Sequence, residues 1–186
     1  MGSIAVRVLS FNDESIDEAF WERRLASAMR VRQSIGLADN PQNNTYRLVH
    51  GEGDLLPGLV IDVYGQTAVM QAHSVGMHIS RDAIARQLVK VMDSRIAHVY
   101  YKSETTLPGK MRTDETGLSD DGTLSYFIYG GSEDNTAMDN GLLFYVDWLR
   151  GQKTGFFVDQ RDNRLLLERF ARGKRDLKKV CCNGGF

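Results

Sequence analysis

The sequence predicts an α+β fold, in which a strand-rich central domain carries one packed helix and follows a connector helix. Three observations predict it. Short β-favouring runs recur between residues 46 and 149, and turn residues such as glycine and proline separate them. One amphipathic run, residues 77–92, interrupts these strands with helical spacing. Before them, residues 12–36 begin acidic and end basic, which is typical of a helix that complements its own dipole.

The composition is that of a globular protein with a sizeable core: 186 residues, 42% hydrophobic and 25% charged, with a formal net charge of −1. No apolar run approaches the ~18–20 residues that span a bilayer, and no signal-peptide pattern is present, so no membrane is expected as a partner. The two cysteines, Cys181 and Cys182, are adjacent and make no disulfide framework. A reducing, cytoplasmic location is therefore expected.

The first element is a short strand at residues 4–9, which has nothing before it to pair with and is expected to be the tail of an upstream unit. The connector helix follows, with Asn12 or Asp13 as its cap, and runs to about Ser34. Gly36 is a natural stop for this helix.

The central region alternates strands with polar turns. Its predicted strands are residues 46–50, 59–64, 67–73, 96–102, 124–129 and 142–149. The helix at residues 77–92 is expected to bury one face, formed by Ile79, Ala83, Ile84, Leu88, Val91 and Met92. Two polar loops, residues 105–123 and 130–141, separate the later strands.

The stretch Lys153–Arg164 concentrates the most chemically committed side chains of the chain. Gly155 stands beside two phenylalanines, and Asp159 is predicted to cap a helix over residues 159–172. A helix start carries unsatisfied N–H groups and a partial positive charge, so it can hold an anion. The stretch therefore predicts one wall of a polar-ligand site. A well-capped surface helix with a solvated charged face explains these residues alone equally well.

Charge is distributed unevenly along the chain. Residues 113–149 contain no Lys or Arg, whereas residues 161–179 contain eight basic and three acidic residues. This basic end favours an anionic ligand or RNA, although a solvated helix face has the same composition. Strand aromatics could also stack on RNA bases, but such residues more often lie in a core. They are Tyr100, Tyr101, Tyr126, Phe127 and Tyr129. The four histidines show no metal-ligand spacing, so no metal site is predicted.

After the predicted helix, a strand at residues 177–182 leads into the glycine pair Gly184 and Gly185. A glycine turn after a strand is how doubly wound nucleotide-binding folds begin, because backbone must approach the cofactor there. A glycine pair alone is weak evidence for such a fold.

Three motifs in order resemble one family. They are Leu56–Asp62 (LPGLVID), Lys153–Arg164 (KTGFFVDQRDNR) and Gly184–Phe186 (GGF). Together they resemble the S-adenosylmethionine-dependent class I ribosomal RNA methyltransferases, in the branch that methylates cytosine-5 of large-subunit rRNA. The resemblance implies that the chain is an internal fragment, with residues 1–11 as the last strand of a truncated PUA domain and 12–39 as the connector helix. Residues 40–150 are then the central domain, and 151–186 the entry to a Rossmann-like methyltransferase domain.

The resemblance also implies a cofactor site for S-adenosylmethionine in the intact protein. The residues expected to serve it are Phe157, Asp159, Gln160, Arg161, Asn163, Gly184 and Gly185. No residue of this chain matches the catalytic cysteine of the family, whose motifs lie further on. The sequence departs from the family before the glycine pair, where Lys178 and Lys179 stand in a strand that a parallel sheet would bury.

The function implied is methyl transfer to carbon 5 of a cytosine by the intact protein, with ribosomal RNA as partner and this chain alone inactive. The alternative is a non-catalytic RNA- or protein-interaction module. The sequence leaves open whether the protein forms a homodimer.

Overall fold

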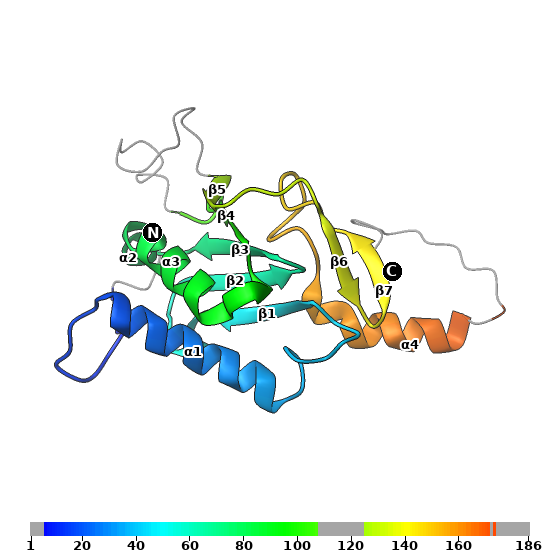
Figure 1. Ribbon diagram of the computed structural model, residues 1–186, viewed down its shortest axis with the longest axis horizontal. Coiled ribbons are helices and arrows are strands. Elements are labelled where there is room, and N and C mark those ends of the chain that lie inside the picture. The colour runs from blue at the N-terminus through cyan, green and yellow to red at the C-terminus, as the bar shows by residue number, and fades with distance from the viewer. Residues whose placement is uncertain (1–5, 108–124, 172, 174–186) are drawn as a thin grey trace.

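The computed structural model describes residues 6–107, 125–171 and 173 (Figure 1). A five-stranded sheet lies at its centre. Helices cover one face of the sheet, and a β-hairpin with the segment after it packs against the other. The predicted α+β class is confirmed.

The central sheet contains five strands in sequential order. They are β1 Thr45–His50, β2 Leu59–Tyr64, β3 Thr67–Ala72, β4 His98–Lys102 and β5 Ser125–Tyr129. All neighbours are antiparallel except β3 and β4, which are parallel. A parallel pair needs a crossover, which α2 Val75–Ile79, α3 Arg81–Met92 and the 3-10 turn η2 Asp93–Arg95 supply.

Helices α1 Glu18–Ser34 and α3 form the layer on one face of the sheet. Their apolar sides and the facing strand residues make the larger core, which includes the fully buried Leu25, Leu48, Ile61 and Leu88. The 3-10 turn η1 Gly51–Asp54 joins β1 to the loop before β2.

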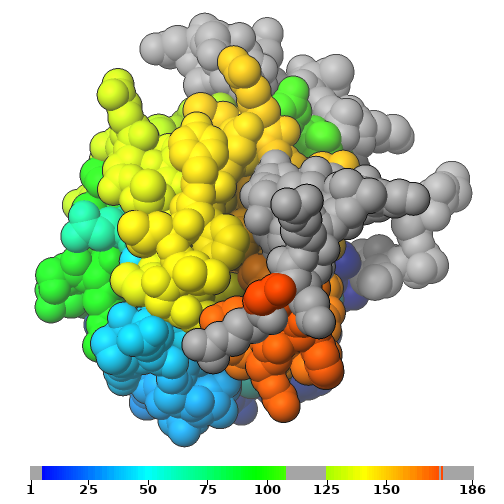
Figure 2. Space-filling view, turned by 90° about the vertical axis from the view of Figure 1, so that its right-hand side faces the viewer, coloured from blue at the N-terminus to red at the C-terminus, as the bar shows by residue number. Residues whose placement is uncertain are grey.

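A smaller core lies on the opposite face of the sheet. Its buried members are Tyr64, Val69, Tyr100, Ala137, Val146, Trp148 and Phe156. The hairpin of β6 Thr136–Asp139 and β7 Leu142–Tyr145 supplies part of this cover, and α4 Arg161–Ala171 lies beside the hairpin (Figures 1 and 2). The sheet is therefore buried on both faces, and strand β3 is buried at every position.

The N-terminal expectations need two corrections. Helix α1 ends at Ser34 as predicted, but its cap is Asp17, whose carboxylate accepts a hydrogen bond from the N–H of Phe20 at 3.0 Å. Residues before it form a local turn instead, in which the N–H of Asn12 donates to Ser10. Residues 6–9 of the predicted first strand form no strand, because no described element pairs with them.

Three corrections concern later elements. The helix predicted at residues 77–92 breaks at Ser80, so Ile79 lies in α2 and is exposed rather than part of the buried face. The loop predicted at 130–141 contains β6, and the strand predicted at 142–149 ends at Tyr145. The predicted strand 177–182 and the pair Gly184 and Gly185 lie outside the described residues.

Among the described residues, none of the helices has the length and apolar character required to cross a membrane.

Candidate functional site

The stretch Lys153–Arg164 runs along the face of the sheet that carries the smaller core. Gly155 adopts a φ of +114°, and a Cβ there would lie 2.8 Å from both the Cα and the N of Trp148. The group that approaches this glycine closely is therefore the chain's own backbone. Glycine is needed because both the backbone angle and the contact exclude a side chain.

A polar network ties this stretch to the sheet through a buried carboxylate. Asp62 on β2 is fully buried, and it accepts hydrogen bonds from Thr154 at 2.6 Å and from Nε and Nη2 of Arg47 at 2.8 and 2.9 Å. The hydroxyl of Tyr64 lies 2.8 Å from Thr154 Oγ1 and donates to the carbonyl of Phe156 at 3.2 Å. A buried carboxylate requires such partners, so the network holds the start of the stretch in one position.

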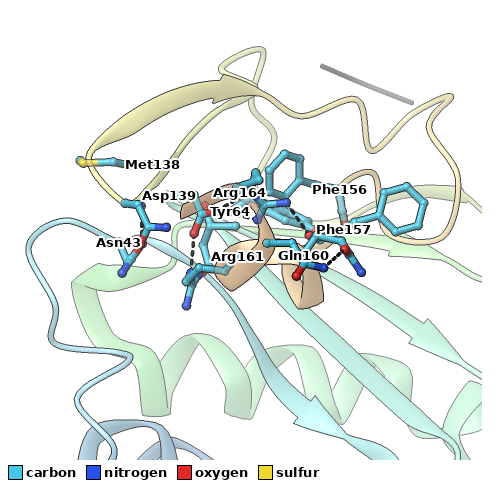
Figure 3. A network of polar contacts seen from close by, with 12 residues as sticks. Asn43, Tyr64, Met138, Asp139, Phe156, Phe157, Gln160, Arg161 and Arg164 are labelled. Atoms are coloured by element: carbon cyan, nitrogen blue, oxygen red, sulfur yellow. Dashed lines mark hydrogen bonds and ion pairs between the residues drawn. The ribbon is translucent and has the colours of Figure 1, made fainter. Parts of the chain in front are cut away.

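A second buried carboxylate holds the start of helix α4 (Figure 3). Asp139 on β6 accepts from Nε of Arg161 at 2.5 Å and from Nε and Nη2 of Arg164 at 2.9 and 2.5 Å. Arg161 also donates to the carbonyl of Thr45, and Arg164 donates to the carbonyl of Phe157 at 2.9 Å. The two arginines therefore join the hairpin, the sheet edge and α4.

The predicted cofactor residues within the described part are close in sequence, but their side chains differ in exposure and in the groups they contact. The ring of Phe157 is half-buried, with Nζ of Lys153 4.8 Å from its centroid. Asn163 donates to Gln160 Oε1 at 2.7 Å, so these two amides pair with each other. Asp159 is exposed and does not cap α4 as predicted, because it lies inside the 3-10 turn η4 Val158–Gln160, which precedes the helix. Their role in cofactor binding stays a prediction.

Two cavities adjoin at this stretch. One, of about 280 Å³, is lined by residues that include Arg47, Gln71, His73, Lys153, Phe157 and Asp159. The other, of about 510 Å³, is lined by residues that include Arg32, Tyr46, Arg47, His50, Asp159 and Arg161. They share Arg47, Val158 and Asp159.

The electrostatics of the smaller cavity favour a charged Arg47 and a neutral His73. The hydrogen bonds to Asp62 raise the pKa of the Arg47 guanidinium. Burial, and then the charges of Arg7 and Arg47, lower the pKa of His73. The cavity therefore offers a fixed cation beside a neutral imidazole near neutral pH.

No group of His, Cys, Asp or Glu among the described residues could hold a metal ion.

Thr154 and Arg164 lie within the predicted stretch, but sequence reasoning did not identify Arg47 or Asp139 as parts of this site. Nothing local marks these two residues, since their partners Asp62 and Arg164 lie 15 and 25 positions away along the chain. Of the aromatic residues considered for RNA stacking, Tyr100 and Tyr101 are buried in the two cores. Tyr126 and Phe127 pack partly buried against these cores, whereas Tyr129 is exposed.

The chain matches proteins named as ribosomal RNA methyltransferases along nearly all of its sequence. Ribosomal RNA large subunit methyltransferase I of Tolumonas auensis is 36% identical over 184 residues, which are 98% of this chain and 44% of that protein. The protein of the same name from Alteromonas mediterranea is 36% identical over 185 residues, with the same two shares. A proposed ribosomal RNA large subunit methyltransferase of Methanocaldococcus jannaschii is 34% identical over 183 residues, or 97% of this chain and 43% of that protein. The chain thus spans less than half the length of these relatives.

Solved structures share the fold. One of a proposed SAM-dependent methyltransferase from Streptococcus mutans superposes with a TM-score of 0.67 at 22% identity, covering 86% of this chain and 38% of that one. Another, of a proposed methyltransferase in complex with SAH, gives the same score and identity and has 37% of its length covered. No protein-family model matches the chain. The resemblance predicted from the three motifs is confirmed: over nearly its whole length, the chain is homologous to the proteins named ribosomal RNA large subunit methyltransferase I.

Proposed function

We propose that this chain is part of an S-adenosylmethionine-dependent methyltransferase that acts on large-subunit ribosomal RNA, at carbon 5 of a cytosine. The observation that carries the proposal is the 36% identity over 98% of the chain to proteins named for that rRNA activity. The position on the base comes from the resemblance of the Lys153–Arg164 motif to the cytosine-5 branch.

In this chemistry a cysteine thiolate attacks the base, and a general base later removes the proton from carbon 5. The described residues would serve the cofactor side of the site. Phe157, Asp159, Gln160, Arg161 and Asn163 are proposed to line it, together with Gly184 and Gly185. When bound, S-adenosylmethionine would supply the methyl group.

The residues present fit this role in part. Phe157 and Asp159 border a cavity, and Gln160 and Asn163 offer amide groups at the start of α4. Arg161 is already held by Asp139 and Thr45, so its contribution would be to position the stretch rather than to bind the cofactor directly. The domain boundaries at residues 11, 39 and 150 and a homodimer remain part of the proposal.

The test is the modification of the rRNA itself. Deletion of the gene should remove 5-methylcytidine from one position of large-subunit rRNA, and plasmid-borne gene should restore it, as measured by mass spectrometry of rRNA fragments. The 186-residue chain, incubated with labelled S-adenosylmethionine and unmodified rRNA, should transfer no methyl group. Unchanged 5-methylcytidine after deletion would refute the proposed reaction.

The alternative is a non-catalytic module that binds RNA or protein. The two adjoining cavities with several cationic side chains favour the RNA form of this alternative. Calorimetric titration separates the two functions: RNA binding that weakens with salt, without any binding of S-adenosylmethionine, supports the module for the isolated chain.

A further inference from the structure

The two adjoining cavities form an elongated groove, called here the Arg47 groove, along β1 and the 3-10 turn η4. Arg47, Val158 and Asp159 line both cavities, so the groove continues past Arg47. Each cavity is of the size of a small-ligand site or less, because such sites range over ~300–1,000 Å³. A groove divided in this way suits successive units of a polymer better than one compact ligand.

Among the charged side chains that line the groove, cations outnumber carboxylates. Arg32, Arg47, Lys153 and Arg161 face Asp54 and Asp159, whereas the whole chain has a net charge of −1. The carboxylates that pair with Arg47 and Arg161, those of Asp62 and Asp139, are buried beneath the groove. Of the three arginines, Arg47 is the most exposed, whereas Arg161 is mostly buried and Arg32 is paired with Asp54.

Arg47 is held in place with donors to spare. Its Nε and Nη2 donate to Asp62. Its Nη1 lies 3.4 Å from Nδ1 of His50 among the described residues. About a third of its side chain is exposed, since 32% of it remains accessible. An arginine fixed by one carboxylate and open on its other side is well arranged to bind a phosphate oxygen.

Lys153 adds a cation that no carboxylate neutralises among the described residues. Its Nζ lies over the ring of Phe157, and Gln71 donates to its backbone carbonyl at 3.2 Å. The neutral His73 and the amide of Gln71 line the same cavity. Cations beside an aromatic ring and neutral hydrogen-bonding groups are the combination that binds single-stranded nucleic acid.

We infer that the Arg47 groove binds single-stranded RNA, with the phosphate backbone contacting Arg47 and Lys153 and a base entering the cavity beside Phe157. The inference rests on the proposed function, because it takes RNA as the substrate. A cofactor carboxylate is the competing occupant, because Phe157, Asp159 and Arg161 line the groove and are also predicted to serve the cofactor. The other two described residues of that prediction, Gln160 and Asn163, do not line the groove.

The test uses the full 186-residue chain and a fluorescently labelled single-stranded RNA of about 12 nucleotides. Fluorescence anisotropy gives the affinity at roughly 50 and 200 mM salt, the range over which phosphate contacts lose strength. The variants are Lys153→Ala and Arg47→Lys. The matched control is Lys90→Ala, which removes a surface cation paired with Glu22 on the helical side of the sheet.

Lys153→Ala should weaken RNA binding roughly three- to tenfold at the lower salt and reduce the salt slope by about one. Arg47→Lys should also weaken binding, because lysine lacks the fork that meets the buried carboxylate and a phosphate together. Lys90→Ala should leave affinity and slope unchanged. Thermal melts confirm that each variant is folded, and Lys153→Ala keeps the test valid if Arg47→Lys unfolds.

Three outcomes would overturn the inference. The first is that the wild-type chain binds no RNA at either salt concentration. The second is that Lys153→Ala has the same affinity and salt slope as Lys90→Ala. Alternatively, the groove variants would weaken binding of S-adenosylhomocysteine and leave RNA binding intact, which would assign the groove to the cofactor. Loss of 5-methylcytidine on gene deletion is measured separately, so the reaction can stand while this inference fails.

Discussion

Two buried aspartates decide where the Lys153–Arg164 stretch lies. Asp62 holds Thr154 at its start, and Asp139 holds Arg161 and Arg164 at its end. A buried carboxylate is costly unless it is paired, but removal of one partner costs more than the pair contributes. These two residues therefore act as anchors, and replacing either of them should destabilise the whole stretch.

Replacement of Asp139 by Asn should strongly destabilise the protein. The change leaves two arginines, one buried and one mostly buried, without their anion, so the free energy of unfolding should fall by about 3–5 kcal/mol. Urea denaturation measures the loss. Asp162→Asn is the matched control, because Asp162 is exposed on the same helix and should change stability by less than about 0.5 kcal/mol. Equal effects of the two changes would show that Asp139 is not an anchor.

Gly155→Ala should also be destabilising, by more than about 1 kcal/mol. The added Cβ would lie 2.8 Å from the backbone of Trp148, and the φ of +114° is unfavourable for alanine. The same substitution at Gly131 meets no atom within 4 Å and should be nearly neutral. Thermal unfolding of the two variants compares them directly. A melting temperature for Gly155→Ala equal to that of Gly131→Ala would contradict the close approach.

At the scale of elements, the sheet buries apolar residues on both faces, whereas α4 buries a charged residue and exposes its apolar ones. Its buried residue is Arg164, while Leu165, Leu166, Leu167 and Phe170 are exposed. The helix is attached by its ion pairs to Asp139 rather than by an apolar face. The sequence predicted a helix here, but it could not show that its apolar residues face outward.

Because the apolar side chains of α4 are exposed, replacing one of them should cost little stability. Phe170→Ser, at a side chain that is 71% exposed, should change the free energy of unfolding by less than about 0.5 kcal/mol. Leu88→Ala on α3 removes a fully buried side chain and should cost about 2–5 kcal/mol. Both values come from urea denaturation monitored by circular dichroism. A loss at Phe170 comparable to that at Leu88 would mean that α4 buries this side in solution.

Strand β4 carries a buried tyrosine that should make the fold sensitive to alkaline pH. Burial raises the pKa of Tyr101 to about 12 from its ordinary value near 10, and its hydroxyl lies 2.7 Å from His78 Nδ1. The folded state thus holds this proton more tightly than the unfolded state does. The stabilisation is full below pH 10 and is lost as the pH rises through about 12.

Tyr101→Phe should therefore flatten part of the decline in stability between pH 10 and 12, while lowering stability at neutral pH through loss of the hydrogen bond. Tyr145→Phe is the control, since Tyr145 is exposed. Denaturation curves at successive pH values measure both effects. An unchanged slope in Tyr101→Phe would show that Tyr101 does not carry this dependence. Part of the decline should remain, because burial also raises the pKa of Tyr64 well above its ordinary value.

For the molecule as a whole, one sheet serves two cores. Adjacent residues of the same strands point to opposite faces, as Val63 and Tyr64 do, so neither core can be removed without exposing the sheet. Trp21 lies in the larger core and Trp148 in the smaller one. The two tryptophans therefore report on the two layers separately.

The two layers should unfold together. Trp21→Phe leaves Trp148 as the fluorescent probe, and Trp148→Phe leaves Trp21. In each variant, the fluorescence transition in urea should coincide with that of circular dichroism, which is the test of a two-state transition. Fluorescence of Trp148 that changes at clearly lower urea would show that the hairpin side opens before the sheet unfolds.

Local chemistry allowed the sequence alone to predict most of the elements. Turn residues on both sides predicted β2 at residues 59–64, and Gly36 predicted the end of α1 at about Ser34. The three motifs also predicted the family resemblance that the relatives confirm. Each of these signals lies within one short stretch, so no knowledge of distant residues was needed.

Only the tertiary structure decided which side chains meet. Arg47 reaches Asp62 because β1 and β2 pair in one register, and Arg164 reaches Asp139 because the hairpin returns over the sheet beside α4. The prediction that Asp159 caps α4 was wrong, because η4 precedes the helix. This turn lines the groove together with Arg47. Ion pairs and cavities depend on distances between residues far apart in the chain. Periodicity and composition carry no information on those distances until the strands have paired.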